Sequence, residues 1–337
     1  MQFTRHHDFS EIPAVSWNTL AAAGISDTPF SRHEYVSQWW KTRGGGEWDQ
    51  AELVLISGSE NGMPVGIAAL FKAQHDGRTA LLLAGSIEIS DYLDLIVRAD
   101  DLQRFLGGLL DLLSRMPECR GLPLDWYNLP DDSPTLKALE TEAARRGWAY
   151  HAEIYRPTPR VYLSGSFEAF LDRLEKKQRH EIRRKVRRAS EGPSPTAFQL
   201  VRSAAQLEAG MGSFFQLMSQ DAGKAHFLKP AMVEHLQSVM RSAFSGGYLW
   251  LGFLTVNGEN AAVALNFDYG NKLWGYNSGV NRDFLELSPG WVLLAHQIKW
   301  ACENGRYEFD FMRGDEEYKY RFGGVNRYVM RARLGAS

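Results

Sequence analysis

The chain has 337 residues and a mass of 38.1 kDa, about twice the length of a typical domain, so two domains are expected. Hydrophobic residues make up 44% and charged residues 23%, which excludes a disordered or fibrous protein. The 38 Lys and Arg residues nearly balance 40 Asp and Glu, so the overall charge excludes a general attraction to polyanions and any such affinity must be local.

The small number of cysteines and the absence of long apolar runs indicate a cytoplasmic protein. Cys119 and Cys302 are the only cysteines, which is too few for a disulfide framework or a metal cluster. The amino-terminal run MQFTRHHDFSEIP has no apolar stretch typical of a signal peptide, and no apolar run reaches the length of about 18 residues that suggests a membrane span. We therefore expect a cytoplasmic protein without a membrane span.

The first half predicts a three-stranded antiparallel meander. The apolar segments AELVLIS, MPVGIAALFKA and RTALLLAG are separated by Asn61-Gly62 and Asp76-Gly77, and these dipeptides are strong signals for tight hairpins. A helix, a strand, a second helix and a last strand are expected to follow, at 100–115, 122–127, 134–146 and 148–155.

The second half repeats this order. The segments YLWLGFLTV, ENAAVALNFDY and KLWGYNSGV are separated by Asn257-Gly258 and Gly270-Asn271. Helices and strands are expected at 289–304, 306–312, 316–322 and 327–334. The pattern predicts two tandem domains of mixed α/β (α+β) class, 1–158 and 159–337, each a mixed, largely antiparallel sheet flanked by helices. The boundary is placed at Pro157 and Pro159, because proline disfavours helices and central strands.

A helix expected at 166–190 opens the second half. Its apolar stripe, spaced by three and four residues, would pack on the sheet. The stripe is Phe167, Phe170, Leu171, Leu174, Ile182 and Val186. Eight Lys or Arg residues stand between Lys176 and Arg188 against one acid, Glu181. This face is either a solvated basic surface or a cradle for phosphates, in which Arg179 and Arg183 would take part.

The segment Ser288-Pro289-Gly290-Trp291 marks the start of the 289–304 helix. Serine is a preferred N-cap and proline suits the first turn. With no acid in that turn, the helix start could bind a phosphate, and Gly290 would admit it close to the backbone. The alternative is an ordinarily capped helix. The equivalent helix of the first half begins at Asp100-Asp101, where two carboxylates would repel an anion, so the donor cleft is expected in the second half.

Acidic residues lie in two further segments. Asp310 and Asp315 follow the 306–312 strand, where open α/β sheets usually bind ligands, although they could instead cap the turn or pair with Arg313 and Lys319. In SDYLDLIV, alternation predicts a strand carrying Asp91, Tyr92 and Asp94, which would be costly to bury unpaired. We interpret those three as acceptor-binding residues in a cleft between the halves, the alternative being a salt bridge between domains. His296 on the 289–304 helix is interpreted as a core or boundary residue rather than a base.

Together, FDFMRGDEEYKYRFG and the preceding SPGWVLLAHQIKWACENG resemble the carboxyl-terminal signature of the GNAT-like acyltransferases associated with cellulose biosynthesis (CelD/BcsL-like). Further similarities are TPFSRHEYVSQWW, SDYLDLIV and LEKKQRHEIRRKVRR, so the resemblance spans most of the chain. That family is related to the FemAB-like transferases with two tandem GNAT-like domains. The resemblance implies the same fold, an acyl-CoA or aminoacyl-tRNA donor and an amine acceptor. The chain departs from ordinary acetyl-CoA enzymes because SPGW replaces their R/Q-x-x-G-x-G/A loop.

We therefore expect an N-acyltransferase that uses acyl-CoA, chiefly acetyl-CoA, and a small-molecule or peptidic amine, with no metal, redox cofactor or DNA partner. Asp310 would remove a proton from the amine, and Tyr318 or Tyr276 would protonate the departing thiolate. Asp315 and Lys319 are expected to contact the substrate. The alternatives are a FemAB-like transferase dependent on aminoacyl-tRNA, whose RNA phosphates the basic helix would contact, and a non-catalytic polyanion-binding module.

Overall fold

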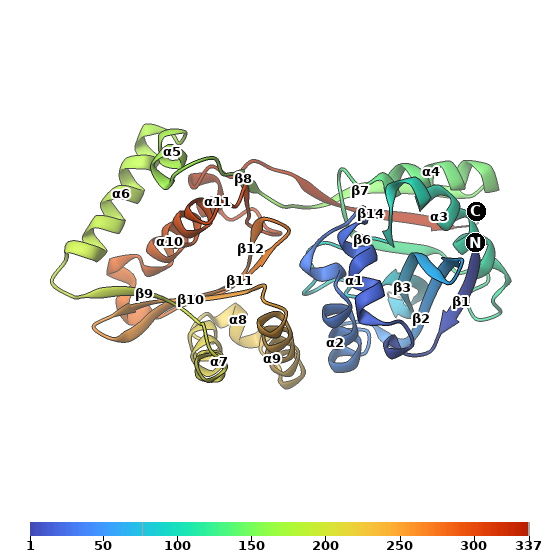
Figure 1. Ribbon diagram of the computed structural model, residues 1–337, viewed down its shortest axis with the longest axis horizontal. Helices are drawn as coiled ribbons and strands as arrows, with labels where there is room; N and C mark the ends of the chain where they lie inside the picture. The colour runs from blue at the N-terminus through green and yellow to red at the C-terminus, as the bar shows by residue number, and fades with distance from the viewer. Residues whose placement is uncertain (76, 336–337) are drawn as a thin grey trace. The chain divides into compact units, whose positions relative to one another are not determined.

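The computed structural model describes residues 1–75 and 77–335, so Asp76 of the predicted Asp76-Gly77 turn lies outside the described residues. The chain forms two compact units, each built on its own mixed sheet with flanking helices (Figure 1). Unit 1 contains Met1–Pro157 and the chain from Arg327 onward, and unit 2 contains Thr158–Asn326. The predicted mixed α/β class is confirmed.

Unit 1 contains the predicted meander. Its strands follow the order β1-β2-β3-β4-β6-β14-β7, with β5 paired to β3; β4 and β6 are parallel and the other neighbours are antiparallel. The strands are β1 (Gln2–His6), β2 (Asp49–Glu60), β3 (Met63–His75), β4 (Arg78–Leu83), β5 (Ile96–Val97), β6 (Leu124–Pro130), β7 (Ala149–Pro157) and β14 (Tyr328–Gly335). Asn61 and Gly62 both have positive φ, as a type I′ hairpin turn requires.

The helices of unit 1 follow local signals. They are α1 (Ala14–Ala22), α2 (His33–Arg43), α3 (Ala99–Arg115) and α4 (Pro134–Arg146), with short 3-10 helices at Phe9–Glu11 and Pro29–Ser31. Leu102, Phe105 and Leu109 of α3 are buried at helical spacing in the core of the unit. Ser133 caps α4 by accepting a hydrogen bond from the Thr135 N–H. The predicted helices at 100–115 and 134–146 are confirmed.

Unit 2 is built on a sheet of order β8-β13-β12-β11-β10-β9, in which β12 and β13 are parallel and the other pairs are antiparallel. The strands are β8 (Arg160–Tyr162), β9 (Thr196–Leu200), β10 (Leu249–Val256), β11 (Glu259–Tyr269), β12 (Lys272–Val280) and β13 (Glu308–Asp310). The predicted hairpins at Asn257-Gly258 and Gly270-Asn271 are confirmed, with positive φ at all four residues.

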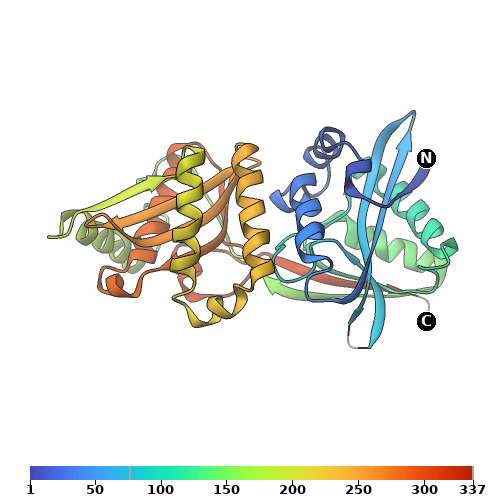
Figure 2. The same cartoon turned by 90° about the horizontal axis from the view of Figure 1, so that it is seen from below.

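Two layers of helices cover this sheet. Helices α7 and α9 lie across one face and α6 and α10 across the other (Figures 1 and 2). The helices are α5 (Phe167–Asp172), α6 (Lys176–Glu191), α7 (Ala204–Met218), α8 (Ala222–Phe227), α9 (Pro230–Ser245), α10 (Pro289–Glu303) and α11 (Glu317–Arg321), with a 3-10 helix at Arg282–Leu287. The single helix expected at 166–190 is thus two helices. The break allows both α5 and α6 to pack on α10.

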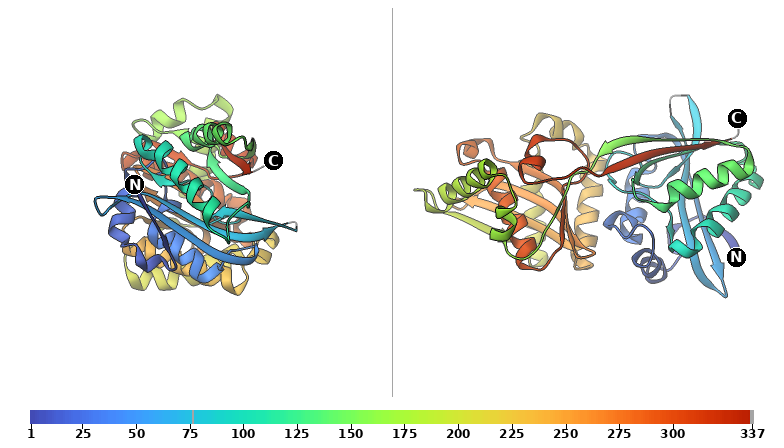
Figure 3. Two further views of the ribbon diagram at one scale, coloured as in Figure 1. Left: turned by 90° about the vertical axis from the view of Figure 1, so that its right-hand side faces the viewer. Right: turned by 90° about the horizontal axis from the view of Figure 1, so that it is seen from above.

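Residues 327–334 form the expected strand, but in a different sheet from the expected one. Strand β14 lies between β6 and β7 of unit 1 (Figure 3), so the chain from Arg327 onward does not follow the expected second domain of 159–337. The physical reason is that the side chains of β14 match the apolar core and the charges of unit 1. Ala332 and Leu334 enter the core of unit 1, while Arg331 forms a two-point ion pair with Asp125.

We expect Ala332→Asp to destabilise unit 1 by several kcal/mol, because Ala332 is 1% exposed and a carboxylate there would have no partner. Hydrogen exchange should accelerate in β6 and β7 and remain slow in β10 and β11. Arg333→Ala is the matched control, since it removes only a partly exposed ion pair with Glu153 and should cost about 1 kcal/mol or less. Equal exchange in both sheets of the Ala332→Asp protein would contradict this assignment.

Candidate active site

Strands β12 and β13 run side by side for only three residues. Lys272–Trp274 pairs with Glu308–Asp310, after which β12 continues to Val280 along β11 while β13 ends. The chain turns away after β13 through Met312 and Gly314, which both have positive φ. Beyond Trp274, no strand of the described residues pairs with this edge of β12. We call the edge from Gly275 to Val280 the open edge.

A bulge and two side chains mark the open edge. The pairing with β11 shifts so that Tyr276 is the extra residue of a β-bulge, a feature that often accompanies functional sites. The Ser278 N–H donates to Asn277 Oδ1 at 2.9 Å, and the Ser278 carbonyl accepts from Lys224 Nζ at 2.6 Å. Both backbone groups of a residue in an antiparallel ladder point the same way, so those of Ser278 face the open edge.

Lys224 is a residue that sequence reasoning missed. It comes from α8, in the helical layer that lies opposite α10, and its ammonium reaches the open edge. Burial lowers the pKa of Lys224, and neighbouring Asp221 and Glu316 partly oppose that change. No sequence pattern points to this lysine, because its role depends on the packing of α8 against the end of β12.

The amino end of α10 lies beside Val280, at the same end of the open edge as Ser278. A Cβ atom at Gly290 would stand 3.3 Å from Val280 Cγ2, and the first turn contains no acid. Ser288 occupies the N-cap position with φ of 52°, but its side chain caps no backbone N–H, contrary to the expected role. Pro289 is the first helical residue, as predicted. The helix start therefore keeps its positive dipole end uncompensated by an acid or a capping side chain.

Two cations flank the indole of Trp291 in this first turn. Lys185 Nζ of α6 lies 4.1 Å from the ring centroid, and the Arg321 guanidinium of α11 lies 5.8 Å from it. Phe322 packs on the same ring at 5.1 Å between centroids. Sequence reasoning missed Lys185 and Arg321 as neighbours of the helix start, although Lys185 belongs to the basic run.

Arg179 and Arg183, the expected phosphate ligands, lie in ion pairs instead. Arg179 pairs with Asp172 at 3.4 Å, and Arg183 pairs with Glu168 on α5. The turn between α5 and α6 brings these two acids alongside the basic helix. Lys185 and Arg321, the cations beside Trp291, are paired as well, Lys185 with Glu181 at 3.5 Å and Arg321 with Glu317.

Asp310 does not present a free carboxylate to the open edge. It is completely buried, its Oδ2 lies 3.1 Å from Arg160 Nε, and its Oδ1 accepts from the Met312 N–H at 2.8 Å. Arg160 on β8 was not among the expected partners. The contacts are typical of a buried structural ion pair, which holds the turn after β13.

The loop after β13 carries the remaining candidates. Lys319 is 2% exposed and its Nζ donates to the carbonyls of Met312, Arg313 and Gly314 and pairs with Glu316 Oε2 at 2.9 Å, so it holds the loop rather than facing a substrate. Asp315 is exposed.

The two candidate tyrosines differ in environment. Burial raises the pKa of Tyr318, and Glu316 raises it further, which keeps the hydroxyl protonated at neutral pH. Its side chain is nonetheless partly exposed and its ring contacts Phe311. Tyr276 is half-buried in the bulge, with its ring 5.1 Å from that of Phe267.

Asp91, Tyr92 and Asp94, the expected acceptor-binding residues of unit 1, do not lie on a strand. Only Ile96–Val97 of SDYLDLIV is a strand, and Tyr92 lies in the core beside Phe30 at 6.3 Å between ring centroids. Asp91 is 9% exposed. Asp94 accepts hydrogen bonds from the Ser133 and Thr135 hydroxyls and the Leu95 N–H, so it is satisfied at the start of α4. Burial raises the pKa of Asp94 to about 6.

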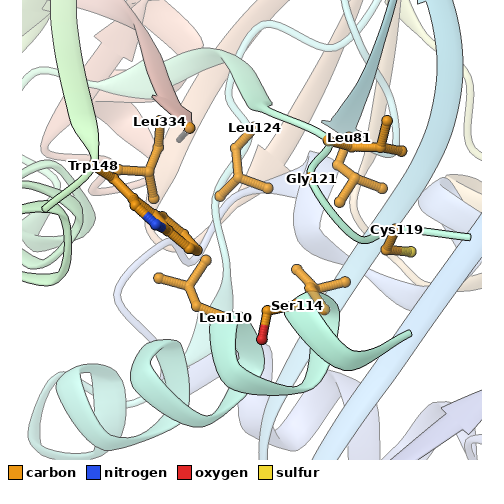
Figure 4. A pocket seen from close by; sticks show the side chains of 11 residues that line it. Leu81, Leu110, Ser114, Cys119, Gly121, Leu124, Trp148 and Leu334 are labelled. Atoms are coloured by element: carbon orange, nitrogen blue, oxygen red, sulfur yellow. The ribbon is translucent and has the colours of Figure 1, made fainter. Parts of the chain in front are cut away.

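Neither His296 nor a small cavity in unit 1 has the features of a catalytic site. The His296 ring stacks on Phe198 at 5.0 Å, and burial lowers its pKa, which agrees with a packing role. An apolar cavity in unit 1 has a volume of about 50 Å³. Leu110, Cys119 and Trp148 are among the residues that line it (Figure 4). It is too small for a cofactor, and burial raises the pKa of the Cys119 thiol. The described residues contain neither a cluster of three or more potential metal ligands nor a helix long and apolar enough to cross a membrane.

Comparisons with known proteins relate the chain to a family and to solved folds. Residues 176–320 match the family described as an acetyltransferase (GNAT) domain. Solved structures with similar folds include FemX, with a TM-score of 0.68 and 12% identity over 98% of this chain and 97% of that chain. A tandem GNAT protein from the clavulanic acid biosynthesis pathway has a TM-score of 0.51 and 12% identity over 98% and 97%.

Another similar structure is the C-terminal domain of a lysylphosphatidylglycerol synthetase described as putative, from Agrobacterium fabrum, with a TM-score of 0.56 and 11% identity over 94% of this chain and 90% of that chain. No curated protein matches the chain significantly. At such low identities the likeness shows the fold alone, and the fold is that of tandem GNAT proteins.

The ion pair of Asp310 yields a prediction that separates a structural role from catalysis. Asp310→Asn would leave Arg160 buried without its counter-charge, so we expect a loss of about 3–5 kcal/mol in the free energy of unfolding. Turnover of the folded fraction at low temperature should stay within a few-fold of the parent. A fall in kcat of two or more orders of magnitude with little change in Tm would instead identify Asp310 as the base.

Asp94 yields a prediction about pH. Its pKa is raised on folding, so its favourable contribution to stability is complete below the unfolded value near 3.8 and is lost as pH rises through about 6. Asp94→Asn lacks this titration. Relative to the parent, the variant should therefore gain on the order of 2 kcal/mol between pH 4 and pH 7.5, measured by urea unfolding. A difference that does not change with pH would contradict the assignment.

Proposed function

We propose that the chain is an N-acyltransferase that moves an acyl group from acyl-CoA, chiefly acetyl-CoA, to an amine acceptor at the open edge of β12. One observation carries the proposal: the parallel strands β12 and β13 separate beside an acid-free helix start that two cations flank. The separation supplies backbone groups for an extended donor, and the helix start supplies a site for its phosphates. The match to an acetyltransferase domain covers the same elements.

The donor would bind from the α10 side of the sheet. Its phosphates would meet the Gly290 N–H, because the Trp291 and Val292 N–H groups already donate to the Ser288 carbonyl, and they would compete with Glu181 and Glu317 for Lys185 and Arg321. Gly290 permits close approach because it has no side chain. The thioester arm would then follow the open edge from Val280 toward Trp274, where β13 closes the gap.

The reaction would take place between the two helical layers. The acceptor's neutral amine attacks the thioester carbonyl, the C–N bond forms, and collapse of the tetrahedral intermediate breaks the C–S bond. Backbone N–H groups on the open edge would stabilise the oxyanion, which is usually the largest catalytic contribution. Tyr318, whose raised pKa keeps it protonated, would donate a proton to the thiolate, and the amine proton would pass to water.

We propose roles for some residues that differ from those expected from the sequence. Asp310 and Lys319 would fix the loop that carries Tyr318, instead of acting on the substrate directly. Lys224 would line the acceptor side of the open edge. An aminoacyl-tRNA is the alternative donor for the same gap, and direct measurement of CoA binding separates the two.

We expect Gly290→Glu to weaken CoA binding at least tenfold in calorimetry, because a carboxylate would stand where the phosphates bind. Gly290→Ala controls for size, since its methyl group would only touch Val280, and it should bind within a few-fold of the parent. Gly212→Glu on α7 controls for charge, because that position is exposed and has open space around it.

Two results would contradict the proposal. One is unchanged CoA affinity in folded Gly290→Glu, which would remove the helix start from donor binding. The other is the absence of CoA binding by the parent protein, which would remove acyl-CoA as the donor.

A further inference from the structure

Helix α10 packs on the sheet of unit 2 through apolar contacts and one polar contact. Its buried residues include Val292, Leu293 and Ile298, which belong to the apolar core of the unit. The polar contact joins α10 to β11, because the side-chain amide N–H of Asn266 donates to Gln297 Oε1 at 2.9 Å. No other side chain of α10 forms a hydrogen bond or an ion pair with another element of the described chain.

Both amides of this pair are buried in an apolar layer. Asn266 is 1% exposed and Gln297 is 6% exposed. Burying an amide costs free energy unless it is hydrogen-bonded, and apolar side chains of similar shape would fill the same space without that cost. What the pair adds is direction. Apolar contacts allow a helix to slide along a sheet, whereas a buried hydrogen bond forms in a single register.

The pair lies at the point where the side chains of β12 change faces. Strand β11 pairs with β12 as Asn266 to Gly275 and as Leu265 to Asn277, so Tyr276 is the extra residue of the bulge. Side chains alternate along a strand, and one extra residue reverses the face that every later side chain occupies. Asn266 is therefore opposite the place where this reversal begins.

Contacts on the two sides of the bulge show the reversal. Before the bulge, the odd-numbered Leu273 packs in the core that contains α10. After it, the even-numbered Val280 packs there, whereas a Cβ atom at Gly279 would stand 2.6 Å from the Met218 backbone nitrogen of α7. Without the bulge, Val280 would point toward α7 and would no longer lie beside Gly290 in the first turn of α10.

We infer that Asn266 and Gln297 are positioning residues, which fix α10 and the bulge in one register and so hold the Gly290 N–H beside the open edge. The inference rests on the proposed function, because that function assigns the donor's phosphates to this N–H. Gln297 itself lies about two turns after Gly290, about 10 Å along the helix axis. The pair therefore acts on the donor through the placement of the helix.

The experiment compares stability with CoA binding. The double variant Asn266→Leu, Gln297→Met replaces both amides by apolar side chains, so no polar group is left buried without its partner and Tm should stay within a few degrees of the parent. CoA should bind about tenfold more weakly in calorimetry, because the charge-assisted hydrogen bond from the helix start is no longer aligned. Gln297→Met alone should weaken CoA binding likewise, and it should lower Tm more, since it leaves the Asn266 amide unpaired.

The matched control is Ile298→Leu, which changes a buried side chain of the same helix that forms no directional bond. It should bind CoA within about twofold of the parent. Hydrogen exchange gives a second measurement that needs no ligand, because a bulge that is free to migrate opens the strand pairing beyond it. The amides of residues 277–280 should exchange about tenfold faster in the double variant, and those of 272–274 should not change.

Two results would overturn the inference. One is a folded double variant that binds CoA and exchanges its amides like the parent. The other is an equal loss of CoA affinity in the double variant and in Ile298→Leu, which would make any change in this apolar layer sufficient. If the parent binds no CoA, the proposed donor is wrong, and exchange at 277–280 decides alone: faster exchange in the double variant supports the inference and unchanged exchange overturns it.

Discussion

The arrangement of the candidate site in unit 2 depends on the point where β12 and β13 stop pairing. Two buried ion pairs stand at this point: Glu308 pairs with Lys272 across the two strands, and Asp310 pairs with Arg160 of β8. Removing either partner would leave a buried charge uncompensated, so both ends of the short β13 are held strongly. The strand cannot extend along β12, because the chain after Asp310 is turned away by Met312 and by the three carbonyls that Lys319 binds.

The open edge is a consequence of that constraint. A backbone edge without a neighbouring strand must satisfy its polar groups in another way, and side chains of Asn277 and Lys224 do so at Ser278. These contacts are exchangeable, because a ligand with its own donors and acceptors could replace them. The same divergence brings the start of α10 beside Val280, so that an extended donor could meet backbone groups along its length and the helix dipole at its charged end.

Helix α6 contacts α10 in two ways. Its apolar side packs on α10, and Lys185 lies over the Trp291 ring in the first turn of α10. The acids of α5 neutralise Arg179 and Arg183, so the distribution of free charge on the helix is set by the neighbouring helix. In unit 1, by contrast, the polar side chains of Asp94, Ser133 and Thr135 satisfy one another around the start of α4.

Local chemistry made much of this fold readable from the sequence. The Asn-Gly and Gly-Asn turns specify hairpins because only those residues readily adopt positive φ at both positions, and Pro289 marks the start of α10 for a similarly local reason. Tertiary structure alone decided which charges meet. Asp310 pairs with Arg160 on β8, β14 joins the sheet of unit 1, and Lys224 reaches the open edge from α8. Each of these contacts joins segments that are distant in the sequence. Several oppositely charged or apolar partners are possible for each segment, and only the folded structure shows which of them it meets.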